Sequence, residues 1–132
     1  MVVLNKIYTR TGDKGETALG NGDRVAKHSL WVSSYGTVDE TNATIGLARQ
    51  HSTGEMDAAL ARVSNDLFDL GADLCTPDRE NDETAPYPRL RMIDAQVDRL
   101  EAEIDAMNAN LTPLRSFILP GGTALAAQLH LC

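Results

Sequence analysis

Apolar side chains recur every three or four residues in the middle of the chain, and this pattern restricts the segment to an amphipathic α-helix. The stripe consists of Met56, Leu60, Val63, Leu67, Leu70 and Leu74. Spacings of four, three, four, three and four residues place all six side chains on one face of a helix. The sequence therefore predicts a helix over about residues 54–75, with this face packed against other helices.

A second apolar stripe with the same stagger follows, and it is formed by Ile93, Val97, Leu100, Ile104 and Met107. It predicts another helix of the same bundle. The intervening segment 76–88 is acidic and carries prolines, so it cannot continue either helix. Because no strand-like alternation competes with these patterns, we predict an all-α fold, an antiparallel helix bundle.

A third predicted helix, about residues 27–49, is unusual because polar and small residues interrupt its apolar positions. Asp39 and Asn42 are three residues apart and therefore share a face. Gly36 and several threonines are weak helix formers in a helix interior. A functional role for this face would explain why polar residues and weak helix formers occur in the helix. From the residues alone, the alternative that Asp39 and Glu40 are solvated or structurally paired is favoured.

Length and composition predict a single domain over residues 1–132. The chain is 42% hydrophobic and has no long apolar run, so we expect neither a membrane span nor a signal peptide, and a cytoplasmic location. Cys75 and Cys132 lie outside any CxxC or Cys/His cluster, which predicts two buried thiols rather than a zinc site. The net charge of −7 argues against nucleic-acid binding.

Residues 8–17 read Tyr-Thr-Arg-Thr-Gly-Asp-Lys-Gly-Glu-Thr and combine backbone amides, hydroxyls and two cations. Gly12 and Gly15 permit the backbone geometry of an anion-binding nest. Arg10 and Lys14 supply charge-assisted donors for phosphate. The spacing is not that of a Walker A loop. The segment alone is explained equally well by a polyphosphate site or by a polar turn near a chain terminus.

A third informative segment, residues 116–123, contains a sharp Pro-Gly-Gly turn. Thr123 is placed to cap the helix that follows. Phe117, Ile118 and Leu119 then lie on a loop, where they either pack under the bundle or face an apolar ligand. Base rates of burial favour packing.

These three segments occur in the order found in PduO-type ATP:cob(I)alamin adenosyltransferases, which the chain resembles over nearly its whole length. Residues 8–15 resemble the nucleotide loop of that family, residues 36–42 its helix motif, and residues 117–123 with 129–130 its third signature. The resemblance implies a ferritin-like, up-down bundle, with five helices in a complete member. It also implies a homotrimer with ATP between neighbouring subunits, an ATP-binding loop over 1–24 and bundle helices over 25–132.

The activity implied by the resemblance is transfer of the 5′-deoxyadenosyl group from ATP to the cobalt of cob(I)alamin. Triphosphate is released, Mg2+ accompanies the phosphates, and cobalamin is a substrate. Cobalt is the nucleophile in this chemistry, which agrees with a sequence in which no Ser-His-Asp constellation is readable. Positioning and charge stabilisation must then carry catalysis.

The resemblance also assigns roles to individual residues. Asp39 would orient an arginine across a subunit interface, Lys27 would add a phosphate contact, and Phe117 would lie below the corrin ring and exclude the lower axial ligand. No metal ligand is assigned. The ATP loop would consist of Thr9, Arg10, Thr11, Gly12, Asp13, Lys14, Gly15 and Thr17.

Two features depart from the family pattern. An arginine-rich helix is expected after Leu129 and His130, but the sequence stops at Cys132, so we expect a C-terminally incomplete chain that is inactive alone and leaves Asp39 without its partner. Trp31 stands where the family often has a polar residue, and we expect it to be buried at a contact. Two alternatives stay open: an ATP-binding regulatory or assembly module without transferase activity, and a structural helical oligomer.

Overall fold

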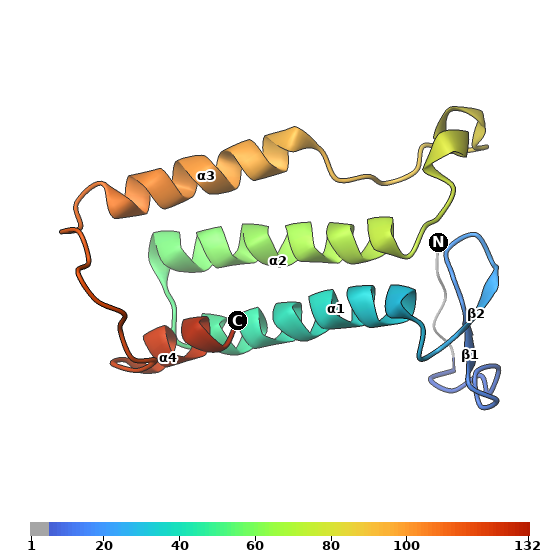
Figure 1. The fold of residues 1–132 in the computed structure, drawn as a ribbon, viewed down its shortest axis with the longest axis horizontal. Helices are drawn as coiled ribbons and strands as arrows, with labels where there is room; N and C mark the ends of the chain where they lie inside the picture. The colour runs from blue at the N-terminus through green and yellow to red at the C-terminus, as the bar shows by residue number, and fades with distance from the viewer. Residues whose placement is uncertain (1–5) are drawn as a thin grey trace.

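The computed structural model describes residues 6–132 and confirms an all-α helix bundle (Figure 1). Three long helices lie lengthwise beside one another, and a short fourth helix packs against the first. Within the described residues, no helix is long and apolar enough to cross a lipid bilayer. The elements are α1 (Leu30–Arg49), α2 (Gly54–Leu74), the 3-10 helix η1 (Arg79–Thr84), α3 (Asp94–Asn108) and α4 (Ala124–Leu131).

Helices α1 and α2 form an antiparallel pair whose connection is braced by charge. Arg49, in the last turn of α1, donates through Nε and Nη2 to the two carboxylate oxygens of Asp57, at 2.9 and 3.2 Å. Ser52 Oγ donates to the same carboxylate at 3.0 Å. A cation at the end of one helix and an anion in the first turn of the next both complement the helix dipoles. The tight connection therefore favours the antiparallel arrangement.

The core of the described chain is small and lies where α1, α2 and α4 meet. Ile45, Ala48 and Leu60 are buried there, and Val63, Leu67 and Leu125 pack against them. Beside this core, Ser64 Oγ donates to Asn42 Oδ1, and Asn42 Nδ2 donates to the Ser64 carbonyl at 3.0 Å. The unusual amide in α1 is therefore fully paired with α2, as buried polar groups must be.

Helix α3 is attached to α2 mainly by polar side chains. Asp66 of α2 accepts from both Arg99 and Gln96 of α3, and Arg62 of α2 pairs with Glu103 of α3 at 2.5 Å. The apolar stripe of α3, which predicted the helix, is largely exposed: Ile93 has an exposed fraction of 61% and Ile104 of 58%. The helix is confirmed, but its stripe is not buried among the described residues.

A short antiparallel hairpin, β1 (Glu16–Ala18) and β2 (Arg24–Ala26), precedes α1 and was not predicted. Thr17 lies opposite Val25 in this hairpin. Strands of three residues are too short to show the alternation that identifies a strand. The thiol prediction is also wrong for Cys132, which follows the last turn of α4 and is exposed among residues 6–132; Cys75 is half-buried.

Because the core is small, Leu60 contributes a large share of its buried apolar surface. We expect Leu60→Ala to lower the free energy of unfolding by about 2 kcal/mol, the lower end of the range for buried leucines, since a thinly covered site can relax around the cavity. Leu111→Ala is the matched control, because Leu111 is 67% exposed, and should change stability by less than about 0.5 kcal/mol. Urea denaturation measures both. Equal losses in the two variants would contradict this core assignment.

Candidate functional site

The predicted nucleotide loop forms a turn directly before β1. The Gly15 N–H donates to the Gly12 carbonyl at 3.2 Å. Gly15 has φ = +85° and Arg10 has φ = +60°, so both lie in the left-handed region. Glycine adopts this conformation at no steric cost, whereas an arginine held there is uncommon. The loop backbone is therefore folded back on itself, as the nest interpretation requires.

Lys27, which lies beyond β2 in the sequence, is brought to the same loop. Its N–H donates to the Gly15 carbonyl at 2.9 Å. A Cβ atom at Gly12 would lie only 2.8 Å from Lys27 Nζ, so the lysine side chain occupies the space that the glycine leaves open. The structure thus places the predicted phosphate contact beside the predicted loop.

Arg24 supports the loop, and the sequence analysis gave it no role. Its Nη2 donates to the Thr11 carbonyl at 2.8 Å and to the Glu16 carbonyl at 3.3 Å. This guanidinium joins β2 to the turn through backbone oxygens. It therefore holds the loop backbone in place whatever side chains the loop carries. Only the loop conformation reveals this contact, because carbonyl partners leave no sequence signal.

The polar groups of the loop face solvent. Thr9, Arg10, Thr11, Asp13 and Lys14 are exposed, and the Thr9 and Thr11 hydroxyl oxygens lie 2.9 Å apart. The Arg10 guanidinium lies 5.2 Å from the centre of the Tyr8 ring, within cation–π range. Thr17 is half-buried on β1. Accessible cations, hydroxyls and amides on one turn can bind a polyphosphate.

The turn of the hairpin docks on the C-terminal end of α2. The Gly20 N–H donates to the Cys75 carbonyl at 2.8 Å, and Asn21 Nδ2 donates to Asp78 Oδ2 at 3.1 Å. A Cβ atom at Gly20 would lie 2.8 Å from Thr76 Oγ1, so only glycine fits this approach without movement. The loop is therefore connected through its hairpin to α2.

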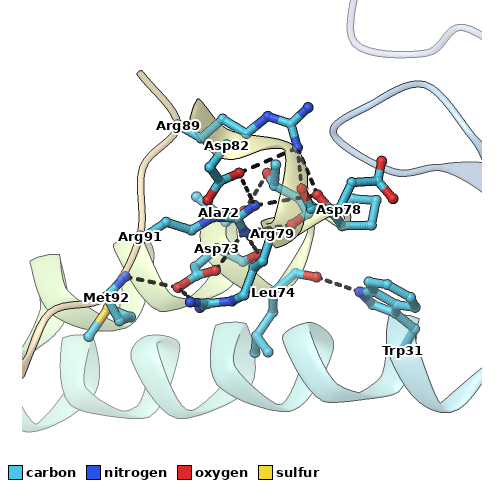
Figure 2. A network of polar contacts seen from close by, with 12 residues as sticks. Trp31, Ala72, Asp73, Leu74, Asp78, Arg79, Asp82, Arg89, Arg91 and Met92 are labelled. Carbon is cyan, nitrogen blue, oxygen red and sulfur yellow. Dashed lines mark hydrogen bonds and ion pairs between the residues drawn. The ribbon is translucent and has the colours of Figure 1, made fainter. Parts of the chain in front are cut away.

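The C-terminal carbonyls of α2 receive donors from distant parts of the chain (Figure 2). The Trp31 indole N–H, at the start of α1, donates to the Leu74 carbonyl. Arg91 Nη1 donates to the carbonyls of Asp73 and Thr76 at 3.2 and 2.6 Å. Trp31 is 44% exposed among the described residues, so its ring is only partly covered within one chain, and its burial at a contact stays a prediction.

Asp73 is the one charged residue classed as buried within residues 6–132, and its carboxylate is surrounded by donors (Figure 2). It accepts from Arg91 Nη1 at 2.8 Å, from Arg79 Nη2 at 2.5 Å and from the Met92 N–H at 2.8 Å. Burial alone would raise the pKa of Asp73, but the Met92 amide and the two guanidinium groups lower it below its ordinary value.

Arg91 links this buried carboxylate to η1. It binds Asp82 through Nε at 2.7 Å and Nη2 at 2.8 Å, a bidentate contact, while its Nη1 binds Asp73. The hydrogen bond from Arg91 lowers the pKa of Asp82, and the hydrogen bonds to Asp82 and Asp73 raise the pKa of Arg91. We call Asp73, Arg79, Asp82, Arg89 and Arg91 the ionic cluster.

Asp39 lies on α1, away from the loop. It is exposed and lines a cavity of about 330 Å3 between α1 and α2, together with Tyr35, Leu67 and Phe68. None of the ion pairs among residues 6–132 includes Asp39. Its proposed arginine partner in another subunit stays a prediction.

Phe117 is fully exposed on the segment between α3 and α4, and its neighbours Ile118 and Leu119 are also exposed. The alternative that base rates alone favour, packing under the bundle, does not occur among the described residues, and the expected role of Phe117 at the corrin ring stays a prediction. In Figure 1 this segment lies at the opposite end of the α1–α2 pair from the hairpin. A single chain therefore does not bring Phe117 to the nucleotide loop. The predicted cap is confirmed: the Ala126 N–H donates to Thr123 Oγ1 at 3.1 Å.

The fold and the loop together define a helix bundle with an exposed, cation-bearing turn at its N-terminal end. A family model described as cobalamin adenosyltransferase matches residues 7–132. The chain therefore belongs to the cobalamin adenosyltransferase family. This membership confirms the family resemblance read from the three sequence motifs.

Relatives and solved structures agree with this family. The chain is 48% identical over 131 residues to a corrinoid adenosyltransferase of Mycobacterium tuberculosis, covering 98% of the chain and 66% of that relative. It is 40% identical over 126 residues to the corrinoid adenosyltransferase PduO of Salmonella typhimurium, and this match covers 94% of the chain and 36% of that relative. The chain also superposes on a solved structure of a variant PduO-type ATP:corrinoid adenosyltransferase from Lactobacillus reuteri, complexed with cobalamin and ATP. The TM-score is 0.83 at 34% sequence identity, and the match covers 96% of this chain and 69% of that one. The chain thus spans about two thirds or less of these relatives.

The lowered carboxylate pKa values predict acid sensitivity. Asp57, Asp73 and Asp82 all have folded-state pKa values below their ordinary range, so protonation costs more in the folded state than in the unfolded state. The free energy of unfolding should be at its full value above the unfolded pKa of about 4 and should fall as the pH drops below it.

Asp82→Asn tests the cause of this pH dependence. The variant should be less stable than the wild type at pH 7, and the difference should shrink as the pH falls below the unfolded pKa of about 4 and on through the lowered folded-state pKa of Asp82, where the wild-type carboxylate also becomes neutral. Denaturation curves across this range measure the difference. A difference between the proteins that is the same at every pH would show that the Asp82 charge is not responsible.

Proposed function

We propose that this protein is an ATP:corrinoid adenosyltransferase, which transfers the 5′-deoxyadenosyl group of ATP to the cobalt of reduced cobalamin. The observation that supports this most is the exposed turn of residues 9–15, where Arg10, Lys14 and Lys27 gather around folded-back backbone in a member of this family. The complexes of the Lactobacillus reuteri relative with cobalamin and ATP support both substrates.

The nucleotide loop binds the triphosphate of ATP in this proposal. The exposed Lys14 and Arg10 donate charge-assisted hydrogen bonds, Lys27 lies beside Gly12, and loop amides with the Thr9 and Thr11 hydroxyls complete the site. Thr17 follows on β1. Mg2+ enters with ATP as a substrate complex, and the exposed Asp13 carboxylate offers the oxygen ligand that this ion prefers.

The transfer itself needs no protein nucleophile. The reduced cobalt supplies an electron pair to the 5′ carbon, a cobalt–carbon bond forms, and the bond between that carbon and its phosphate oxygen breaks. Triphosphate leaves with the bonding pair, and its developing charge is stabilised by the loop cations. Phe117, whose ring is fully exposed, covers the lower face of the corrin so that water or another ligand cannot reach the cobalt.

Two subunits contribute to each site in this proposal. α1 has 20 residues and is therefore roughly 30 Å long, and the nucleotide loop and the Phe117 segment lie at its opposite ends. Reacting atoms must approach within about 3 to 3.5 Å. The loop of one subunit therefore meets Phe117 of a neighbour, in a homotrimer. Asp39 on the exposed side of α1 orients an arginine across the same interface.

An ATP-binding module without transferase activity is the second candidate. It is favoured by one observation: the loop is fully formed within one chain, whereas Phe117 and Asp39 are not assembled with it. Equilibrium binding separates the two functions, because the transferase binds both ATP and cobalamin and the module binds ATP alone.

Lys14→Ala tests the loop. Removing this ammonium group should raise the Kd for ATP at least tenfold, because a hydrogen bond to a charged group contributes about 1.5 to 3 kcal/mol. The Kd for cobalamin should change little. Lys6→Ala, which removes an exposed lysine before the loop, is the matched control. If calorimetry shows the same ATP affinity in Lys14→Ala and wild type, the loop does not bind phosphate.

Mixed oligomers test the composite site. In a protein that carries the arginine-rich helix expected after His130, Phe117→Ala and Lys14→Ala should each lose most transfer activity, and Phe117→Ala should retain ATP binding. When differently tagged copies of the two variants are co-expressed, about a quarter of the sites in randomly mixed rings receive an intact loop from one subunit and an intact Phe117 from the next. Activity should reappear to that extent. A mixture as inactive as the separate variants would place both residues in sites formed by one chain.

A further inference from the structure

Residues 9–15 of the nucleotide loop include no buried side chain, and the loop is connected to the hairpin that follows it, where Leu19 is buried. Arg24 and Lys27, which hold the loop backbone, both lie on or just after β2. The turn of the hairpin contacts the segment after α2: the Gly20 N–H donates to the Cys75 carbonyl, and the Asn21 side chain donates to Asp78. The place of the loop is therefore determined by the segment that begins at Cys75.

That segment is held by the ionic cluster rather than by apolar packing. Residues 75–91 contain no residue of the buried core. Instead Arg89 Nη1 donates to the Pro77 carbonyl at 2.9 Å, and Arg91 bridges Asp73 of α2 to Asp82 of η1. Figure 2 shows these side chains converging on the end of α2, beside the Trp31 contact. Asp73 is the anchor on the helix, because it is 4% exposed and accepts from three donors.

The helix itself offers no substitute for these donors. α2 has no basic residue in its last turn, so the cations that complement its C-terminal dipole come from Arg79, Arg89 and Arg91. Loss of the Asp73 charge would take one carboxylate partner from Arg79 and one from Arg91, and would leave a single side-chain oxygen to accept from the Met92 amide and both guanidinium groups. The segment that receives the hairpin turn would then be free to move while the α1–α2 core stays intact.

We infer that Asp73 and Arg91 are positioning residues for the ATP loop: through the segment 75–91 and the Gly20 turn, they hold the loop where its cations meet the triphosphate. This inference rests on the proposed function, since it concerns the same loop. Neither residue touches the substrate, and neither is in the sequence motifs that identify the family. A role limited to stability would reduce the amount of folded protein but leave the ATP affinity of the folded fraction unchanged.

The test compares two carboxylates on the same helix. Asp73→Asn removes the anchor, and Asp66→Asn is the matched control, because Asp66 also pairs with a guanidinium near α3 but contacts no part of the segment 75–91. The Kd for ATP of the folded protein is measured by calorimetry for the full chain. Asp73→Asn should raise it about tenfold, the change expected for loss of one phosphate contact, while Asp66→Asn leaves it within about twofold.

Two further readouts locate the effect. Trp31 is the only tryptophan of the chain, and its indole donates to the Leu74 carbonyl, next to Asp73 in the sequence. Without ATP present, the fluorescence of Trp31 should therefore shift in Asp73→Asn and remain unchanged in Asp66→Asn. The Gly20 amide should exchange its hydrogen faster in Asp73→Asn. Arg91→Lys should weaken ATP binding less than Arg91→Ala, because lysine keeps the charge and loses the bidentate contact.

Gly20→Ala keeps the test decisive if Asp73→Asn does not fold. The added Cβ would displace the turn from Thr76 without touching the ionic cluster, and it should raise the Kd for ATP as well. Unchanged ATP affinity in Gly20→Ala, or in folded Asp73→Asn, would overturn the inference. Failure of the wild type to bind ATP would instead contradict the proposed function, so the two outcomes are distinguishable.

Discussion

The hydrogen bonds at the C-terminal end of α2 connect α1, the hairpin beside the nucleotide loop and the long segment before α3. A helix ends with four carbonyls that have no partner within the helix, and here the carbonyls from Asp73 onward are satisfied by donors remote in sequence. Trp31 supplies one from the start of α1, Gly20 one from the hairpin turn, and Arg91 others from the approach to α3. One helix end therefore sets the relative positions of α1, the nucleotide loop and the long connection.

The distribution of apolar contacts explains why polar contacts have this importance. The buried cluster of Ile45, Ala48 and Leu60 lies toward the other end of the α1–α2 pair, where the two helices are joined. Ion pairs at the end of α2 are partly buried, and a buried carboxylate is tolerated only when several donors surround it. Asp73 meets this condition with three donors. Directional hydrogen bonds specify the hairpin docking more narrowly than apolar packing would.

The helices could be predicted from the sequence because their signals are local. The stripe that predicts a helix at 54–75 corresponds to α2 at 54–74, and Thr123 caps α4 as expected. The helix predicted at 27–49 begins at Leu30 because Ser29 is its cap, its hydroxyl accepting from the Val32 N–H. The turn at Gly12 and Gly15 could also be anticipated from the two glycines in one short segment, whereas ATP binding by the loop residues stays a prediction.

The contacts that the sequence did not predict depend on how distant segments of the chain come together in the fold. Asp73 and Arg91 are 18 residues apart, and nothing near either residue indicates that a long acidic connection returns one to the other. Arg24 and Gly20 act through backbone carbonyls, which every residue possesses, so their roles appear only when the hairpin is in place. The exposure of Phe117 follows from the position of its segment beyond the end of the helices.

The separation of the loop from Phe117 has a consequence for catalysis. A site assembled within one rigid bundle would hold its two substrates at a fixed distance, whereas these groups lie at opposite ends of helices about 30 Å long. In the proposed adenosyl transfer, formation of the cobalt–carbon bond would therefore require a second subunit, and association would be a precondition for reaction rather than a source of stability alone. In such a site, the accuracy with which each bundle presents its own loop at the interface determines whether the 5′ carbon meets the cobalt. The donors at the end of α2 control that accuracy, which links a structural feature of one chain to the reaction of the assembly.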